Sequence, residues 1–549
     1  MLGERRQRIS TRFETQPDGG DAVLYVTSRT GNRISVFDIG TTGPATRIDQ
    51  QSLSDDTTAL EIIDIDGVAH AVALGPANPE PMAFRINANG TLDNTGTTLL
   101  NAAQNEPQTL TQTQTAGGAY LYAATDAGVL MSYRQTENGD VQAIQAPALP
   151  DGASRLLAAE SGSGQYLIVA SADAAQVTSY EVLTDGSLQV RATLGAAQGL
   201  GVTGVSALTQ VNLPDGEYIV VAAQGSSSLS VMRLGENGSL TATDQVIDDL
   251  NTRFQSVIGL DVVTLGDQVF VVVGSGDDGV SIFALLPGGT LLHMASLADD
   301  FNMTLDNVSS VAAIAQGGLI QIFVGSETEA SVTQLSFDPG PLGDTLLGTS
   351  GNDLMPGTGL GEILWGGAGD DFLRGRGGDD IVMDGAGQDR LEGGGGRDVF
   401  VLSADGQYDR IMDFTPGEDS IDLSSWPMQR NVGQISFIQT VDGARMMFAD
   451  EELRIYSADG QPLSAAQILT PSLINQSRIP TGSATIQADF VGSAAADRFV
   501  GNDDANYLSG AGGADSLFGG DGSDTLDGDG GNDLLHGETE DSIYDPVAA

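Results

Sequence analysis

The chain has 549 residues, of which 73 are glycine and none is cysteine or lysine, and its formal net charge at pH 7 is −51. This length predicts more than one domain. The lack of cysteine excludes disulfides, cysteine-ligated zinc, iron–sulfur clusters and thiol nucleophiles. The strong negative charge disfavours nucleic acid as a partner and favours cations.

The first residues, 1–14, contain basic side chains but no apolar stretch, which is not the pattern of a secretory signal peptide. The longest apolar runs, such as 218–223 and 269–273, have the length of strands. They are far below the roughly 18 residues that a membrane-spanning helix needs. We therefore expect no membrane span, and an export signal elsewhere if the protein leaves the cell.

Units of about fifty residues recur seven times between about residues 10 and 338. Each unit contains an apolar strand-like run and then a bulky apolar residue, namely Phe37, Phe84, Tyr133, Tyr180, Met232, Phe283 and Leu335. In the first six units a glycine follows six residues later, in hairpin sequences such as Asn237-Gly238. Each unit thus predicts about four antiparallel strands. Seven small sheets arranged radially predict an all-β fold with a seven-bladed β-propeller over residues 1–338.

The two ends of this ring differ. Residues 11–15 match the innermost strand of other units, so blade one is predicted to be nearly complete. Blade seven has no evident outer strand, because the residues after Asp338 already follow a different period. How the ring closes is left open by the pattern.

The unit resembles the YVTN/lactonase-type propellers, with the best local match at 25–28 (Tyr-Val-Thr-Ser) and 32–37. That resemblance implies the seven-bladed fold and admits a lactone hydrolase. Such a site would need His, Arg and carboxylate groups to converge at the mouth of the ring. We interpret His70 and His293 as surface residues. Four charged residues could line one face, with solvated loops as the alternative: Arg29, Arg33, Glu160 and Glu327.

After Asp338 the period changes to nine. Seven nonapeptides fill 339–401 without interruption, and six more fill 492–545. Their sixth positions are Asp344, Asp353, Glu362, Asp371, Asp380, Asp389 and Asp398, then Asp497, Asn506, Asp515, Asp524, Asp533 and Ser542. The eighth positions are apolar throughout, as in Leu364, Leu373 and Leu517. Two arrays in register, with an apolar residue at one fixed position, disfavour a flexible Gly/Asp linker.

This pattern resembles the G-G-x-G-x-D-x-U-x repeat of RTX calcium-binding proteins. It predicts a parallel β-roll with two nonapeptides per coil and the eighth residue pointing inward. Carboxylate and carbonyl oxygens are the ligands that Ca²⁺ prefers. The predicted metal ligands are the aspartates at the sixth position: Asp344, Asp353, Asp371, Asp380, Asp389, Asp398, Asp497, Asp515, Asp524 and Asp533. Stacked loops lie 18 residues apart, which pairs Asp353 with Asp371, Asp371 with Asp389, Asp380 with Asp398, and Asp515 with Asp533.

Some turns depart from the repeat. Glu362, Asn506 and Ser542 replace the aspartate, so sites that use them are predicted to be weak or empty. Arg374, Arg376, Arg390 and Arg397 are expected to offset part of the acidic stack. His536 is interpreted as a surface residue.

Between the arrays, residues 409–423 resemble the segment that caps the roll in serralysin-type C-terminal domains. No His-Glu-x-x-His motif occurs, which excludes the zinc proteolysis of that family. The predicted domains are a propeller (1–338), a first array (339–402), a capping segment (403–490) and a second array with a C-terminal secretion signal (491–549).

The RTX resemblance implies type I secretion and several bound Ca²⁺ ions. We expect residues 339–549 to be largely disordered without Ca²⁺ and to fold with it. The propeller is predicted to be a binding or scaffold module whose ligand or surface partner is left open. The alternatives are a secreted lactonase-type hydrolase and a calcium-rigidified surface or adhesion protein.

Overall fold

The computed structural model describes residues 9–14, 22–28, 32–40, 44–53, 59–75, 81–98, 107–125, 127–136, 141–144, 149, 152–171, 174–196, 200–249, 251–299, 305–326, 332–426, 432–449, 451–470, 473, 487–491, 498–500, 507–510, 512–519, 525–528, 530–537 and 542–544.

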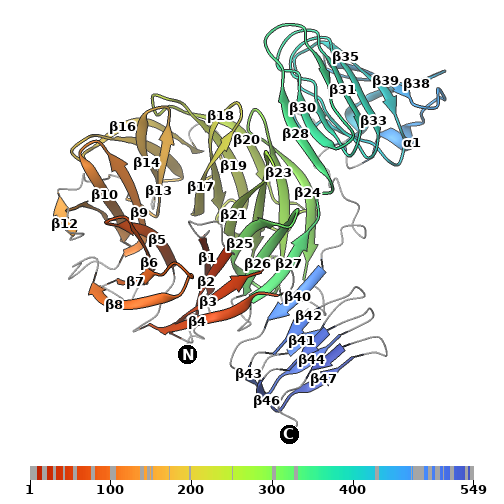
Figure 1. Cartoon of the computed structure of the whole chain (residues 1–549). Coiled ribbons are helices and arrows are strands. Elements are labelled where there is room, and N and C mark those ends of the chain that lie inside the picture. Colours follow the sequence, from red (N-terminus) through yellow and green to blue (C-terminus); the bar gives the residue numbers. More distant parts are fainter. Residues whose placement is uncertain are drawn as a thin grey trace, which may run out of the picture.

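The N-terminal region is the predicted seven-bladed β-propeller, built from seven antiparallel sheets around a central axis (Figure 1). The strands of each blade are given from the innermost outward. Blade one contains β1 (Ile9–Glu14), β2 (Ala22–Ser28), β3 (Arg33–Ile39) and β4 (Thr46–Ser52), and blade two contains β5 (Ala59–Ile65), β6 (Val68–Leu74), β7 (Met82–Ile86) and β8 (Leu92–Thr98). Blade three contains β9 (Pro107–Thr115), β10 (Gly118–Thr125), β11 (Leu130–Gln135) and β12 (Val141–Ile144), and blade four contains β13 (Arg155–Ser161), β14 (Gly164–Ala170), β15 (Gln176–Val182) and β16 (Leu188–Gly195). Blade five contains β17 (Val205–Leu213), β18 (Gly216–Ala223), β19 (Ser228–Leu234) and β20 (Leu240–Ile247), and blade six contains β21 (Val257–Leu265), β22 (Gln268–Ser275), β23 (Gly279–Leu286) and β24 (Thr290–Ala298). Blade seven begins with β25 (Val308–Gln316), β26 (Leu319–Ser326) and β27 (Val332–Phe337).

The periodic hairpin glycines have two roles. Gly238 and Gly289 adopt φ angles of 77° and 78°, which glycine tolerates without a steric penalty. A Cβ atom at either position would also collide with a tyrosine ring of the preceding blade, Tyr166 or Tyr218. The Tyr166 hydroxyl donates a hydrogen bond to the carbonyl of Glu236 at 2.6 Å. The glycine therefore lets the next blade approach closely enough for this contact.

Blade seven takes its outer strand from a segment 150 residues further along the chain. Strand β40 (Gln487–Val491) pairs antiparallel with β27, with Gln334 opposite Asp489. The sequence pattern had assigned no outer strand to this blade. Across the seam with blade one, the Gln334 side chain accepts a hydrogen bond from Ala45 N at 3.1 Å, and Gln316 Nε2 donates to Ile39 O at 3.0 Å.

The first array forms the predicted parallel roll. One sheet contains β28 (Leu342–Leu347), β30 (Gly361–Trp365), β32 (Ile381–Met383), β34 (Val399–Val401) and β36 (Ser420–Asp422). The other, here called the outer sheet, contains β29 (Leu354–Pro356), β31 (Phe372–Gly377), β33 (Arg390–Gly395), β35 (Tyr408–Phe414), β39 (Glu451–Ser457), β38 (Gly443–Phe448) and β37 (Ser436–Thr440). Eighth-position residues pair 18 apart, as Leu373 does with Leu391, and they are buried between the sheets. The capping segment thus continues the roll through β35, β36 and β39, and adds a 3-10 turn (Val432–Gln434) and the short helix α1 (Ala465–Ile468).

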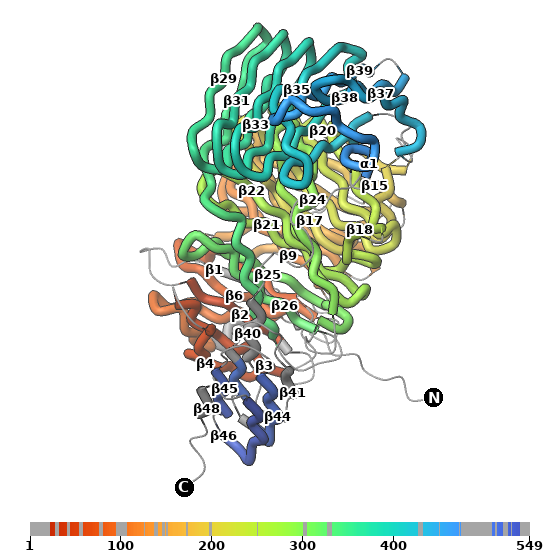
Figure 2. The backbone as a smooth tube through the Cα atoms, turned by 90° about the vertical axis from the view of Figure 1, so that its right-hand side faces the viewer, coloured from red at the N-terminus to blue at the C-terminus, as the bar shows by residue number. Residues whose placement is uncertain are grey.

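The first roll packs against the propeller through the sheet that contains β30, and Figure 2 shows the roll beside β22 and β24 of blade six. Ile363 and Ile381 belong to the same apolar cluster as Phe270 and Met294 of blade six. Gln268 Nε2 donates hydrogen bonds to Gly343 O (3.2 Å) and Gly361 O (2.7 Å) at this junction. Apolar burial and these hydrogen bonds therefore fix the roll to the side of the ring.

The second array continues directly from blade seven. Strand β40 also pairs in parallel with β42 (Tyr507–Ser509), which is followed in the same sheet by β45 (Thr525–Asp527) and β48 (Ser542–Tyr544). The facing strands are β41 (Arg498–Val500), β44 (Ser516–Phe518) and β47 (Leu534–His536), with a short ladder of β43 (Gly512–Gly513) and β46 (Gly530–Gly531). The eighth-position residues Leu508, Leu517 and Leu526 are fully buried.

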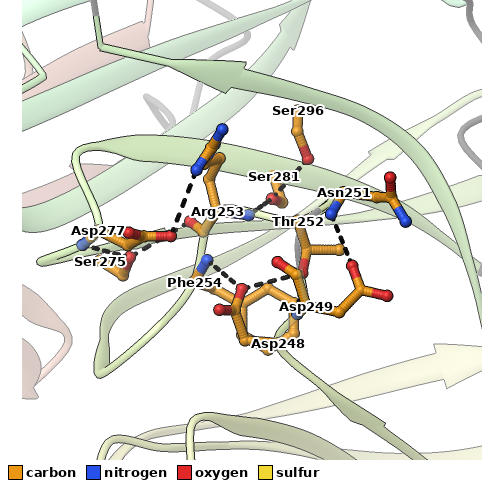
Figure 3. A network of polar contacts seen from close by, with 10 residues as sticks. All are labelled: Asp248, Asp249, Asn251, Thr252, Arg253, Phe254, Ser275, Asp277, Ser281 and Ser296. Carbon is orange, nitrogen blue, oxygen red and sulfur yellow. Dashed lines mark hydrogen bonds and ion pairs between the residues drawn. The ribbon is translucent and has the colours of Figure 1, made fainter.

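His293 is not a surface residue, contrary to the prediction. It lies on outer strand β24 but is only 5% exposed, and its ring packs against Phe283 with 5.2 Å between ring centroids. Its Nε2 atom forms a hydrogen bond of 2.7 Å with Ser296, which joins Ser281 and the backbone of Arg253 in the polar network of Figure 3. Burial lowers the pKa of His293 to about 4. The imidazole is thus a neutral structural group.

Strand β40 should be required for propeller stability. It lies between β27 and β42, so a proline in its centre, Asp489→Pro, removes a ladder hydrogen bond. We expect a loss of about 1–3 kcal/mol in unfolding free energy, measured by thermal unfolding of the full chain in Ca²⁺ with far-ultraviolet circular dichroism. The matched variant Asp489→Ala keeps the amide and should melt near the wild type. Equal melting of the two variants would contradict the role of this strand.

Candidate metal centres

The sixth-position carboxylates form a regular ladder along one edge of the first roll. The backbone N–H of Asp353 donates to Asp371 Oδ1 at 2.7 Å, and that of Asp371 donates to Asp389 Oδ1 at 2.7 Å. The next rung comes from the capping segment, because Asp389 N donates to Asp409 Oδ1 at 3.0 Å. Each carboxylate therefore fixes the turn that precedes it by 18 to 20 residues.

A second ladder runs along the opposite edge. Glu362 N donates to Asp380 Oδ1 at 2.8 Å, and Asp380 N donates to Asp398 Oδ1 at 3.0 Å. Asp419 completes it by accepting from Asp398 N at 3.2 Å. In the second array the described rung is equivalent, with Asp515 N donating to Asp533 Oδ1 at 2.9 Å. The structure therefore brings together all four predicted pairs.

The second oxygen of these carboxylates is what a cation could use. The Oδ2 atoms of Asp371, Asp380, Asp389 and Asp533 are buried and receive no hydrogen bond from the protein. A buried carboxylate oxygen without a donor is costly, by about 1–3 kcal/mol or more. A row of such oxygens at the loops fits Ca²⁺, a hard cation that takes six to eight oxygen ligands.

The first-position glycines leave room for this arrangement. A Cβ atom on Gly366 would lie 2.6 Å from Asp371 Oδ2, the carboxylate of the same turn. A Cβ atom on Gly375 would collide in the same way with Asp380 Oδ2. These glycines are therefore needed because the carboxylate of the same turn and a backbone carbonyl of the next coil both lie against them.

Without a cation, carboxyl groups of the ladders have raised pKa values. Burial, together with the nearby charges of Asp398 and Glu362, raises the pKa of Asp380 to about 8. Burial also raises the pKa values of Asp389, Asp409 and Asp419 to about 7. Ionising these groups at neutral pH therefore requires a compensating positive charge.

Two carboxylates of a buried cluster of three were not among the predicted ligands. Asp384, Asp389 and Asp409 are all buried, and one oxygen from each lies within 4.8 Å of the others, which is a spacing that could hold a metal ion. Asp384 Oδ1 accepts hydrogen bonds from Gly385 N at 2.6 Å and Ser403 N at 2.8 Å. The sequence signal was available, because Asp384 occupies a first position at which the repeat prefers glycine.

Other residues that were predicted to form or to neutralise the metal sites have different surroundings. Asp344 is exposed and stands outside both ladders. Glu362 is buried, but its carboxylate is occupied by the backbone and hydroxyl of Thr358 in its own turn. Arg374 forms an ion pair with Glu392 at 2.5 Å, so it does not reach the ladder aspartates. Asp497, Asn506 and Asp524 lie outside the described residues, as do Arg29 and Glu327.

A cleft of about 600 Å³ opens on the propeller between blades two, three and four. Its lining includes Asp64, Gln112, Gln135, Glu160 and Gln165. Gln165 Nε2 donates to Glu160 Oε1 at 2.9 Å, and Gln112 bridges to the backbone of Asp64. The described lining residues include no histidine or arginine, so they offer amides and carboxylates rather than the set expected of a lactonase.

Comparison with known proteins identifies the C-terminal repeats. The sequence model of the RTX calcium-binding nonapeptide repeat matches residues 491–526 and 500–535, and that of the peptidase M10 serralysin C terminal matches residues 241–454. The second match begins within the propeller and ends in β39. The chain thus carries RTX calcium-binding repeats and a serralysin-type C-terminal domain, both typical of secreted proteins. No curated protein matches the chain.

Several solved structures share part of the fold. A protein from Lactobacillus plantarum is 16% identical, with a TM-score of 0.43, over 61% of this chain and 93% of its own. A provisionally assigned 6-phosphogluconolactonase from Bacteroides fragilis is 15% identical, with a TM-score of 0.42, over 62% and 93%. A periplasmic gluconolactonase from Pseudomonas aeruginosa is 20% identical, with a TM-score of 0.39, over 52% and 85%. No helix among the described residues is long and apolar enough to cross a membrane.

The raised carboxyl pKa values predict an inverted pH dependence. In chelator the folded roll binds more protons than the unfolded chain, so its stability is present at low pH and is lost as pH rises through the folded pKa values of about 7 and 8. In chelator the roll should therefore keep folded structure at about pH 5 and lose it at about pH 8, whereas in Ca²⁺ it should be more stable at about pH 8, since protons compete with the metal. Tryptophan fluorescence during heating measures both. Greater stability at the higher pH in chelator would refute this account.

Proposed function

We propose that this chain is a secreted calcium-binding protein whose β-rolls fold when Ca²⁺ binds, and whose propeller is a binding or scaffold module. The observation that carries the proposal is the pair of carboxylate ladders with buried, unpartnered oxygens at Asp371, Asp380 and Asp389. In this proposal the ligands are the ladder aspartates together with Asp384 and Asp409.

Electrostatics and chain entropy both oppose folding without the metal. Two carboxylates about 4 to 6 Å apart repel by on the order of 1–4 kcal/mol, depending on the local dielectric. The glycine-rich loops lose more backbone entropy on ordering than other residues would. One inward apolar residue in nine offsets little of this. Calcium binding therefore supplies folding free energy.

Calcium-dependent folding suits export by a type I system, in which the chain crosses the envelope unfolded. Ca²⁺ sites of extracellular modules have dissociation constants of about 10⁻⁴ to 10⁻³ M. Sites in this range would stay empty inside the cell and fill outside it. The lack of cysteine is compatible with this route, since the chain needs no disulfide to be stable.

The second array links calcium to the propeller. Because β40 belongs both to blade seven and to the sheet of the second roll, ordering the roll also places the strand that completes the ring. The propeller should therefore reach full stability only after the second array has folded. The cleft between blades two and four, with its amide and carboxylate lining, supports a binding role for the completed ring.

Intrinsic tryptophan fluorescence tests the proposal in the full chain. Both tryptophans lie in the first roll and its cap, and Trp365 also packs against the apolar cluster shared with the propeller, so their emission reports on the first roll and its contact with the ring. We expect a cooperative blue shift as Ca²⁺ is added to chelated protein. Asp380→Asn, which removes a buried ladder charge, should weaken the midpoint by about tenfold.

The neighbouring variant Asp379→Asn is the matched control. Asp379 is exposed, and its side chain accepts a hydrogen bond from Arg397 N at 2.8 Å, which an asparagine oxygen can also accept. This control should titrate like the wild type. Identical emission in chelator and in millimolar Ca²⁺ would contradict the proposed function.

A further inference from the structure

Four arginines cross the outer sheet of the first roll in a single register. Arg390 of β33 lies opposite Arg410 of β35, Arg410 lies opposite Arg454 of β39, and Arg454 lies opposite Arg445 of β38. We call these four residues the arginine row. Their neighbours along the strands, such as Ile411 and Ile455, are fully buried between the sheets. The arginines therefore lie on the face that points away from the roll core.

This arrangement is unfavourable for the sheet alone. Like charges that face each other directly across strands are destabilising. The chain has 74 acidic side chains against 23 basic ones, so acidic partners are abundant in the sequence. Arg445 pairs with Glu452 at 2.6 Å, and Arg454 pairs with Asp442. Neither Arg390 nor Arg410 forms an ion pair with any described residue, which leaves two guanidinium groups available on one face.

Aromatic and apolar side chains surround the row. Arg410 lies over the ring of Tyr408, with 4.5 Å from Cζ to the ring centroid, and Arg454 lies over Tyr456 at 4.7 Å. Phe372 is in register with Arg390 at one end of the row, and Ile438 is in register with Arg445 at the other. The surface thus combines guanidinium forks with flat apolar contacts along one line.

The interval between the arginines favours an anionic polymer whose charges lie at a similar interval. Neighbouring strands are about 4.8 Å apart, so the backbone positions of the four arginines repeat at about that interval. Double-stranded DNA carries a charge about every 1.7 Å along its axis, which is much denser. A linear polysaccharide with one carboxylate on each sugar presents charges about one sugar ring apart, an interval comparable to the strand spacing. Arginine binds carboxylates with two parallel hydrogen bonds, and tyrosine rings pack against the apolar faces of sugars.

We propose that the arginine row binds a linear acidic polysaccharide that carries one carboxylate on each sugar ring. This inference rests on the proposed function, because the four strands align only in the folded, calcium-bound roll. It gives an otherwise strongly acidic protein a local site for an anionic polymer.

The test measures binding of a fluorescently labelled oligogalacturonate to the full chain in Ca²⁺ by fluorescence anisotropy. The wild type should bind it, and raised salt should weaken binding. The double variant Arg390→Ser/Arg410→Ser should bind at least about tenfold more weakly. The matched control Arg47→Ser/Arg85→Ser removes the same charge from exposed positions of the propeller and should bind like the wild type.

Several results would overturn the inference. They are no binding by the wild type, equal loss in the two double variants, or equally tight binding of a neutral glucose oligomer or a DNA oligonucleotide. The calcium-dependent shift in tryptophan emission separates the two proposals. If the wild type shows no shift, the proposed function is refuted. If the wild type shows the shift but does not bind the oligogalacturonate, only the inference about the arginine row is refuted. If the serine variant loses that shift, its roll has not folded, and the double variant Arg390→Lys/Arg410→Lys is tested in its place. Lysine keeps the positive charge but cannot form the two parallel hydrogen bonds that arginine forms with a carboxylate. This lysine variant should bind measurably more weakly than the wild type, and wild-type affinity would overturn the inference.

Discussion

In the first roll, a sixth-position carboxylate gives one oxygen to the backbone amide of the turn before it and leaves the other buried without a donor. Asp371, Asp380 and Asp389 all do this. The hydrogen bond sets the 18-residue stacking, and the remaining oxygen creates a need for positive charge that the protein itself does not meet. In the proposed function, the same group specifies the fold and makes that fold conditional on a cation.

This condition extends beyond the roll. The sheet of the second array continues into blade seven through β40, and the first roll shares an apolar cluster with blade six through Ile363 and Ile381. If the second array folds with calcium as proposed, the strand that closes the propeller couples the metal to a region that contains none of the proposed ligands. Loss of calcium should therefore loosen the ring at blade seven first.

Much of this architecture could be predicted from the sequence, because both repeats are regular. The fifty-residue period predicted seven blades, and the nonapeptide register predicted the stacked pairs, including Asp380 with Asp398. Ring closure could not be predicted, since β40 is short and lies far from blade seven in the sequence. The burial of His293 was also missed, because it depends on packing against Phe283 and on Ser296 rather than on any local pattern.

Some missed features did have a sequence signal. Asp384 replaces a first-position glycine. The outward-facing residues also differ from one nonapeptide to the next, since one strand has an apolar pair, such as Ile381 and Met383, and the following strand has a polar pair, such as Arg390 and Glu392. That alternation distinguishes the sheet that packs on the propeller from the sheet that carries the arginine row. The register of the arginines could not be predicted from the sequence, because Arg410 and Arg454 lie in the capping segment, which does not have the nonapeptide period.

Hydrogen–deuterium exchange of the full chain, read peptide by peptide, tests most directly whether the ladders depend on calcium. In chelator, peptides from 342–401 and 507–536 should exchange as unstructured chain, whereas peptides from blades two to six stay protected. Millimolar Ca²⁺ should protect both arrays. Protection of the array peptides in chelator equal to that in Ca²⁺ would contradict the account.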